Sequence, residues 1–106
     1  MRFLSLGDKW SASIFMSQDP VAIDSVGLDF LRAEPRATAV NGGHPDNFLH
    51  EAAQIGNPPS GTKYDPEQDG TLLTQSLGVH EHWNNPTDKK YSRNLGMKEG
   101  IELLAL

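Results

Sequence analysis

The sequence predicts a small α/β or α+β domain in which two amphipathic helices pack on a few short strands. Apolar residues recur at helical spacing in two segments, and short apolar runs bounded by polar residues lie outside them. The 10 Gly and 7 Pro among 106 residues favour extensive loops between these elements. A chain of this length is expected to form a single domain over residues 1–106.

The first strand is predicted at 11–17, where a brief apolar run lies between small polar residues. A helix follows directly, because Asp19 is a good N-cap and Pro20 suits the first helical position. Glu34 ends this helix, since the residue before Pro35 avoids helical geometry. The predicted apolar stripe comprises Ala22, Ile23, Val26, Phe30 and Leu31, and the other faces carry Asp24, Ser25, Asp29 and Arg32.

A second helix is predicted from His44 to about Ile55, and Gly56 is expected to stop it. Its inward stripe consists of Phe48, Leu49, Ala52 and Ile55. The next residues, 57–78, have the composition of a loop, and loops this long in compact domains are usually functional or disordered.

The remaining chain is predicted to be extended or turned. Residues 78–83 indicate a strand or an extended segment, and residues 84–88 indicate a turn. A terminal strand is predicted at 100–106.

Composition excludes several classes of function. With no Cys, the chain has no disulfide framework, iron–sulfur cluster, thiolate zinc site or cysteine nucleophile. The formal net charge of −5 gives no general attraction to nucleic acid or to anionic membranes. No apolar run approaches the roughly 18–20 residues of a transmembrane helix, so a soluble, cytoplasmic chain without nucleic-acid or membrane partners is expected.

The strongest candidate site is a pair of histidines, His80 and His82, separated by one residue. In an extended segment both side chains point to the same face, and two neutral imidazoles can share a divalent metal ion. Two histidines make an incomplete site, so a third ligand such as Asp19, His44 or Asp88 must come from elsewhere. The alternative is that both imidazoles only hydrogen-bond the loop backbone.

Five other residues are candidates for binding a small ligand. Asp19 lies where a predicted strand meets a helix, a common ligand position in α/β folds, although a helix cap worth about 1 kcal/mol is the alternative. Asp24 lies near the same helix start, where a favourable interaction with the helix dipole is a sufficient structural reason. Tyr91, Arg93 and Asn94 follow two lysines and could hold an anion, or could form a solvated loop with the tyrosine packed inward.

Residues 64–70 are similar to the opening of a calcium-binding loop. Asp65, Glu67 and Asp69 alternate, and Gly70 follows as the turn residue. The twelfth position is Ser76, where a bidentate Glu is required, so a plain acidic turn is the favoured interpretation.

Several segments resemble one protein family. The stretch S-Q-D-P-V-A-I-D-S-V-G at 17–27, S-L-G-V-H-E-H-W-N-N at 76–85 and Y-S-R-N-L-G at 91–96 resemble the uncharacterised bacterial "domain of unknown function 362" family. The resemblance covers residues 10–104, nearly the whole chain. Asp19, Pro20, Asp24 and Gly27 match its motif, but the family has no agreed activity and assigns these positions no role.

Members of that family are much longer than 106 residues. The resemblance therefore implies a C-terminal portion of a larger α/β protein, with a missing N-terminal portion as its partner. A longer parent could be exported. The cysteine-rich, ferredoxin-like segments of some relatives have no counterpart here, so no iron–sulfur cluster is expected.

These observations favour a metal- or small-ligand-binding segment of a larger protein, with a divalent metal ion as cofactor. One alternative is a non-catalytic module that self-associates into a homo-oligomer through the edge of its terminal strand. A second alternative is a hydrolase-like enzyme that uses a His/Asp metal site. The candidate metal ligands are His44, His80 and His82, and whether the chain is an enzyme is left open.

Overall fold

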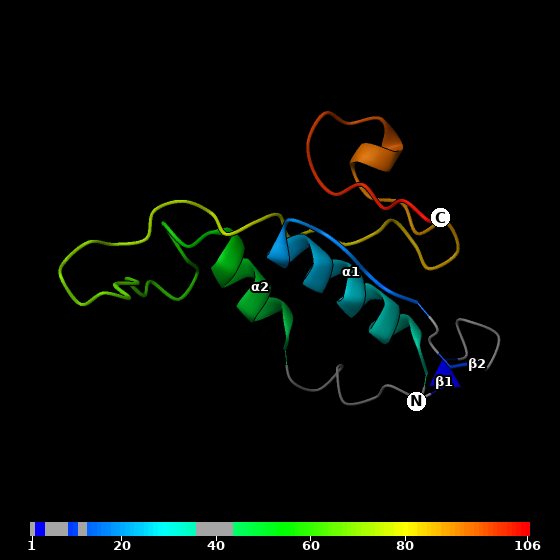
Figure 1. Cartoon of the computed structure of the whole chain (residues 1–106), viewed down its shortest axis with the longest axis horizontal. Coiled ribbons are helices and arrows are strands. Elements are labelled where there is room, and N and C mark those ends of the chain that lie inside the picture. Colours follow the sequence, from blue (N-terminus) through cyan, green and yellow to red (C-terminus); the bar gives the residue numbers. More distant parts are fainter. Residues whose placement is uncertain (1, 4–8, 11–12, 36–43) are drawn as a thin grey trace.

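The computed structural model describes residues 2–3, 9–10, 13–35 and 44–106. Its two α-helices lie side by side, and the chain after them crosses back over the first helix (Figure 1). The elements, in order, are β1 (Arg2–Phe3), β2 (Lys9–Trp10), α1 (Pro20–Ala33), α2 (Asp46–Ala53) and the short 3-10 helix η3 (Arg93–Leu95).

The predicted α/β or α+β fold is wrong, because the described part of the chain is helical. Its strands are limited to the two-residue segments β1 and β2, which pair antiparallel with Arg2 opposite Trp10. This pair is too short to offer a sheet face on which helices could pack. The helices instead pack on each other and on irregular chain.

The predicted strands at 11–17, 78–83 and 100–106 do not form. Residues 13–17, 78–83 and 100–106 carry no strand, and residues 11–12 lie outside the described part. Part of the physical reason is visible in segments 78–83 and 100–106, where several backbone N–H groups donate to side chains and not to a neighbouring strand. The N–H groups of Val79, Trp83 and Leu103 donate to Asp19, Asp29 and Asn94, respectively.

Helix α1 confirms the predicted N-cap and both helix ends to within a residue. The Asp19 carboxylate accepts the N–H groups of Val21 and Ala22 at 3.0 and 2.9 Å, and the helix ends at Ala33. The sequence placed Ser25 and Asp29 outside the apolar, inward-facing stripe of this helix. That prediction is wrong in part, because both polar residues are buried. Polar partners from the later chain cover this side of the helix, as described below.

Helix α2 is shorter than the predicted 44–55. It begins at Asp46, its C-cap is Gln54, and Gly56 lies beyond that cap. The predicted inward stripe is also wrong in part, since Phe48 is 75% exposed. Leu49 and Ala52 are half-buried, and Ile55 is buried beyond the helix end.

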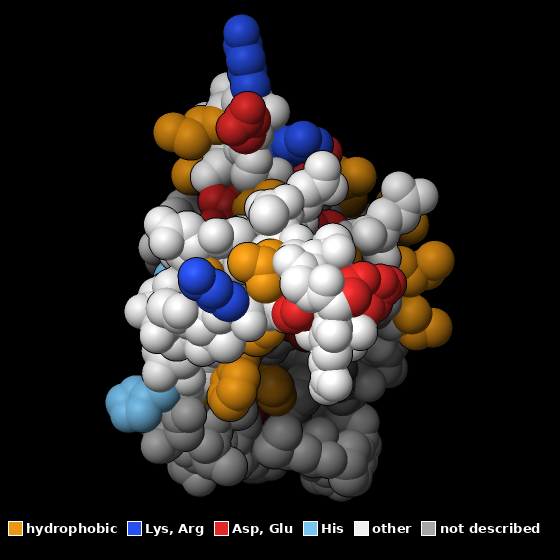
Figure 2. All heavy atoms as spheres, turned by 90° about the vertical axis from the view of Figure 1, so that its left-hand side faces the viewer, with side chains coloured by type: hydrophobic (Ala, Val, Ile, Leu, Met, Phe, Trp, Pro, Cys, Tyr) orange, Lys and Arg blue, Asp and Glu red, His pale blue; other side chains and the backbone are white. Residues whose placement is uncertain are grey.

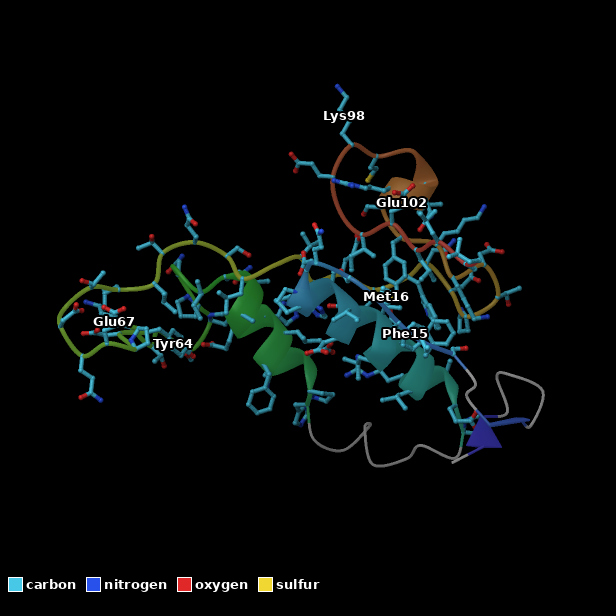
Figure 3. The ribbon with its side chains drawn as sticks, in the orientation of Figure 1. Phe15, Met16, Tyr64, Glu67, Lys98 and Glu102 are labelled. Atoms are coloured by element: carbon cyan, nitrogen blue, oxygen red, sulfur yellow. The ribbon has the colours of Figure 1, made fainter. Side chains whose placement is uncertain are left out.

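The hydrophobic core lies between α1 and the C-terminal part of the chain. Its buried centre consists of Val26, Tyr91 and Ile101, against which partly buried apolar side chains pack. Phe15, on the segment before α1, adds a ring 5.4 Å from that of Phe30. Figure 3 shows Phe15 and Met16 beside the C-terminal segment, whereas Lys98 extends away from the molecule.

Residues 57–77 form the predicted loop, which contains no helix or strand and projects beyond α2 (Figure 1). Glu51 ties the loop to α2, since its carboxylate accepts the Tyr64 hydroxyl at 2.6 Å and the Ser60 N–H at 2.8 Å. Figure 2 faces this end of the molecule and shows acidic, basic and apolar side chains interspersed. No helix in the described residues is long and apolar enough to cross a bilayer.

Candidate metal centre

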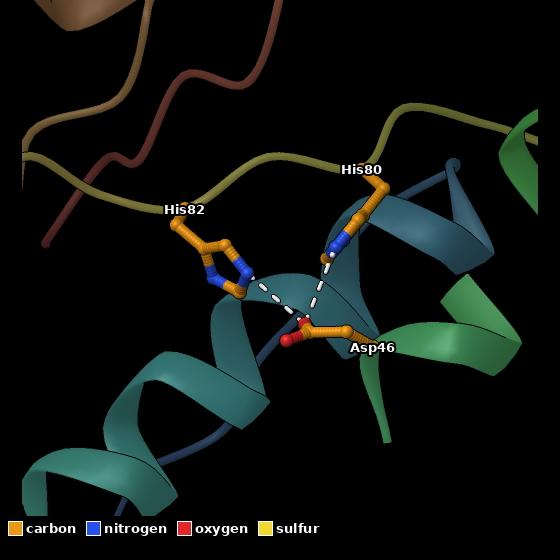
Figure 4. Close-up of side chains that lie close together, drawn as sticks. All are labelled: Asp46, His80 and His82. Atoms are coloured by element: carbon orange, nitrogen blue, oxygen red, sulfur yellow. Dashed lines mark ion pairs between the residues drawn. The ribbon is translucent and has the colours of Figure 1, made fainter. Parts of the chain in front are cut away.

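Three side chains from two distant segments converge on one point. His80 and His82 come from the chain that crosses α1, and Asp46 is the first residue of α2 (Figure 4). The Asp46 Oδ1 atom lies 3.4 Å from His80 Nε2 and 3.0 Å from His82 Nε2. All three atoms lie within 4.8 Å of one another.

The spacing of residues on α1 explains why both histidines face the same way. Ser25 and Asp29 are four residues apart, so one helical turn separates them by about 6 Å along the axis. His80 and His82 are two residues apart, which spans about 6.6 Å in extended chain. The two pairs therefore match in register, with His80 opposite Ser25 and His82 opposite Asp29.

The hydrogen bonds of Ser25 assign the tautomer of His80. The Ser25 hydroxyl donates its single hydrogen to the carbonyl of Val21 at 2.8 Å. It must then accept from His80 Nδ1, which lies 2.7 Å away. The Nε2 atom consequently carries a lone pair, and the side chain that presents it is only 2% exposed.

Asp29 orients His82 in the same way. Its Oδ1 lies 2.6 Å from His82 Nδ1, and an ionised carboxylate only accepts, so Nδ1 donates. The other oxygen, Oδ2, accepts the Trp83 N–H at 2.9 Å and the Tyr91 hydroxyl at 2.7 Å. Asp29 is thus a buried, fully bonded carboxylate that fixes the ring of His82, whose Nε2 faces Asp46 Oδ1.

Two atoms at the convergence point have no hydrogen-bond partner within the described chain. These atoms are Asp46 Oδ1 and His80 Nε2, and both are buried. Buried polar atoms in folded proteins nearly always have a partner. Lone pairs that face one another across a few ångströms are unfavourable unless a cation lies between them, so this geometry fits a bound metal ion.

The charges around Asp46 keep it ionised. Arg32 contacts Asp46 Oδ2 at 2.8 Å, which leaves Oδ1 free for the histidines. Burial raises the pKa of Asp46, but the hydrogen bond from Arg32 and the charges of His82, Arg32 and His80 outweigh it, so the net pKa is lowered. Ligands must be unprotonated to bind a metal, so this shift favours binding.

Burial lowers the pKa of His80, and the charges of His82 and His50 lower it further. The carboxylates of Asp46 and Asp29 oppose this shift without reversing it. His80 is therefore neutral near pH 7, the form in which imidazole binds a metal.

The distances suit a transition metal. Nitrogen and oxygen ligands at about 2.0–2.2 Å from one ion stand roughly 3.0–3.5 Å from each other. The separations of 3.0 and 3.4 Å between Asp46 Oδ1 and the two imidazole Nε2 atoms lie in that range. Three protein ligands leave coordination positions open, and the 41% exposure of the His82 side chain places the cluster at the surface.

The third residue of the cluster is Asp46 and not one of the three that the sequence suggested. Asp19 caps α1 and accepts the N–H of Val79, Asp88 accepts from Asn85, and His44 is not in the cluster. Sequence reasoning placed Asp46 inside the helix predicted at 44–55 and missed it as a ligand. The same reasoning missed Ser25 and Asp29, whose one-turn spacing beside the His80/His82 pair was the available signal.

The other ligand-binding candidates lie apart from this cluster. Asp24 is exposed, whereas Tyr91 is buried with its hydroxyl on Asp29. Asn94 Oδ1 accepts the N–H groups of Tyr91 and Leu103, so this side chain links the segments that precede and follow η3. Arg93 lines a separate cavity of about 490 Å³ between the segment before α1 and the C-terminal segment, and Asp19 lines it too.

The calcium-like segment forms an acidic turn. The Asp65 carboxylate accepts the N–H groups of Asp69 and Gly70 at 3.2 and 2.8 Å, and Asp69 accepts that of Thr71 at 2.9 Å. The carboxylates thus accept hydrogen bonds from the backbone of their own turn, in line with the interpretation of this segment as a plain acidic turn.

No protein-family model matches the sequence, and no curated protein or solved structure matches the chain. The resemblance to the "domain of unknown function 362" family stays a prediction.

Proposed function

We propose that this chain binds a divalent transition-metal ion through His80 Nε2, His82 Nε2 and Asp46 Oδ1. The observation that carries the proposal is the pair of buried, unpartnered atoms, Asp46 Oδ1 and His80 Nε2, which face each other at 3.4 Å. A metal ion would give both atoms a partner and would use the lone pair of His82 as well.

The donor set narrows the identity of the ion. Two imidazoles and one carboxylate suit Zn²⁺, Fe²⁺ or Ni²⁺, whereas Ca²⁺ and Mg²⁺ prefer oxygen ligands alone. Two-histidine, one-carboxylate sets recur in zinc and non-haem iron centres that keep positions open for water or substrate.

The surroundings support a site that is organised before the ion arrives. Ser25 and Asp29 hold the Nδ1 atoms of the two histidines, and Arg32 holds the second oxygen of Asp46. Such outer contacts orient metal ligands, and losing one typically costs about 10–100-fold in affinity. Each of the three ligands here has one.

Calorimetric titration of the metal-free protein with Zn²⁺, Ni²⁺ and, without oxygen, Fe²⁺ tests the proposal. We expect saturable binding of a single ion to the wild type. Removal of a ligand in His80→Ala, His82→Ala or Asp46→Ala should weaken binding by more than about 100-fold, beyond the usual cost of an outer contact.

His44 provides a matched control, because it is exposed to solvent and lies outside the cluster. His50 is not a control, since its ring packs against that of His80 at 4.6 Å. Binding should survive in His44→Ala, and circular dichroism should show that every variant keeps its helices. Absence of heat with all three ions, or unchanged binding in a His80→Ala/His82→Ala double variant, would refute the proposal.

A further inference from the structure

We infer that the open side of the metal takes a small carboxylate, with one oxygen on the ion and another on Arg32. This inference rests on the proposed metal site and names the class of ligand that the site would accept. It comes from the cavity beside His82 and from the unused donors of Arg32.

A cavity of about 290 Å³ lies between α1 and the chain at 82–86, and His82 is the cluster residue that lines it. Its lining includes His82 and Arg32, together with Asp29 and the Trp83 side chain. This volume lies at the lower end of ligand pockets, which run from about 300 to 1,000 Å³, so it suits a ligand of a few heavy atoms.

Arg32 is the cation that faces this cavity. Its guanidinium has five N–H donors, and the contact of NH1 with Asp46 Oδ2 at 2.8 Å is its one partner among the described residues. The side chain is 30% exposed, so its remaining donors are accessible. A guanidinium presents parallel donors that match the two oxygens of a carboxylate.

The other polar groups of the cavity are already engaged. Asp29 accepts three hydrogen bonds, and the side chains of Asn84 and Asn85 fold the turn through hydrogen bonds to its backbone and to Asp88. Arg32 is therefore the group that remains to recognise a ligand. The indole of Trp83 adds an apolar wall, which favours an organic carboxylate over a fully hydrated inorganic anion.

The charge balance makes the binding depend on metal. The carboxylates of Asp29 and Asp46 outnumber the single guanidinium of Arg32 around the site, so the metal-free site does not attract an anion. A divalent ion adds two positive charges to this balance. An anion should consequently bind the metal-loaded protein and not the metal-free protein.

The test uses Co²⁺-loaded protein, because the visible spectrum of Co²⁺ reports changes in its ligands. Acetate and propionate should shift the spectrum saturably, whereas neutral acetamide should not. Arg32→Gln should weaken acetate binding about 10- to 100-fold, the expected effect of losing a hydrogen bond to a charged group. Arg93→Gln removes an equal charge from a residue that lines a different cavity and should leave acetate binding unchanged.

Arg32 also supports Asp46, so cobalt occupancy is measured first and each titration is made at saturating cobalt. Arg32→Lys is the second variant, which keeps the positive charge but lacks the parallel N–H donors of a guanidinium. Weaker acetate binding in this variant supports the inference. Failure of cobalt to bind wild type overturns the metal site itself. Cobalt binding without an acetate response, equal acetate affinity in Arg32→Gln, or tighter binding of inorganic phosphate overturns the carboxylate assignment alone.

Discussion

Asp29 is the residue on which the local structure of the site depends. It is 5% exposed, and its two oxygens accept from the His82 ring, the Trp83 backbone and the Tyr91 hydroxyl. A buried carboxylate is costly unless hydrogen bonds replace its water, and here three donors do so. Asp29 thereby connects the candidate ligand His82 to the hydrophobic core through Tyr91.

Tyr91 gives this connection a measurable pH dependence. Burial, the hydrogen bond to Asp29, and the charges of Asp29 and Glu81 raise the pKa of Tyr91. The unfolded chain ionises its tyrosines near pH 10, whereas folded Tyr91 stays neutral there. The stability from this group is fully present below about pH 10 and is lost as the pH rises further. Denaturant unfolding measured across this range should show the loss.

Tyr91→Phe tests the assignment. It should cost about 1–2 kcal/mol of unfolding free energy at neutral pH, because Asp29 loses a donor. It should also flatten the alkaline decline. Tyr64→Phe is the matched control, since Tyr64 lies on the loop and its hydroxyl bonds Glu51 near the surface. An equal effect of both substitutions would show that the core contact to Asp29 is not responsible.

The start of α1 shows how one capping residue organises a second segment. One Asp19 oxygen caps the helix, and the other accepts the Val79 N–H at 2.9 Å. Gly78 allows this approach, since a Cβ at that position would lie 1.9 Å from Asp19 Oδ1. The cap therefore fixes where the histidine-bearing chain begins its path over α1.

Asp19→Ala should lower the free energy of unfolding by about 1–2 kcal/mol, the upper part of the range for lost N-caps, because it also frees Val79. Gly78→Ala should be destabilising too, since Asp19 must move away from the added methyl group. Asp24→Ala removes the same charge from an exposed position of the same helix and should change stability little. Thermal unfolding of the three variants tests the capping role of Asp19. Similar losses of stability in Asp19→Ala and Asp24→Ala would contradict that role.

Elements set by local chemistry could be predicted from the sequence, and those set by distant partners could not. The bounds of α1 follow from Asp19, Pro20 and Pro35, which act on their own neighbourhood. The predicted strands failed because a strand needs a paired neighbour, and side chains such as Asp29 satisfy the backbone instead.

The candidate site likewise has one part that could be predicted from the sequence and one part that could not. The shared face of His80 and His82 follows from a spacing of two residues, so the sequence contained it. Asp46 lies far away in the sequence and reaches the site only because α2 packs on α1. No local pattern marks such a residue as a ligand.

At the scale of the whole molecule, polar contacts link three segments that share little core. Few apolar residues are buried in the described part of the chain, and the central cluster of Val26, Tyr91 and Ile101 lies on the side of α1 toward the C-terminal chain. Helix α2 is joined to the rest by the Arg32–Asp46 ion pair, the His50–His80 ring contact at 4.6 Å and the hydrogen bond from Leu77 N–H to the Ala52 carbonyl.

A metal ion at the candidate site would connect α2 to the chain that crosses α1, so binding should stabilise the whole fold. A ligand that binds only the folded state adds about 2.7 kcal/mol when its concentration is 100 times the dissociation constant. We expect Zn²⁺ to raise the midpoint of thermal unfolding of the wild type in a concentration-dependent manner. His44→Ala should respond equally, whereas Asp46→Asn, which keeps the size of the side chain, should respond weakly because its amide is a poorer ligand. A midpoint that zinc leaves unchanged in the wild type would mean that the three side chains converge without binding a metal.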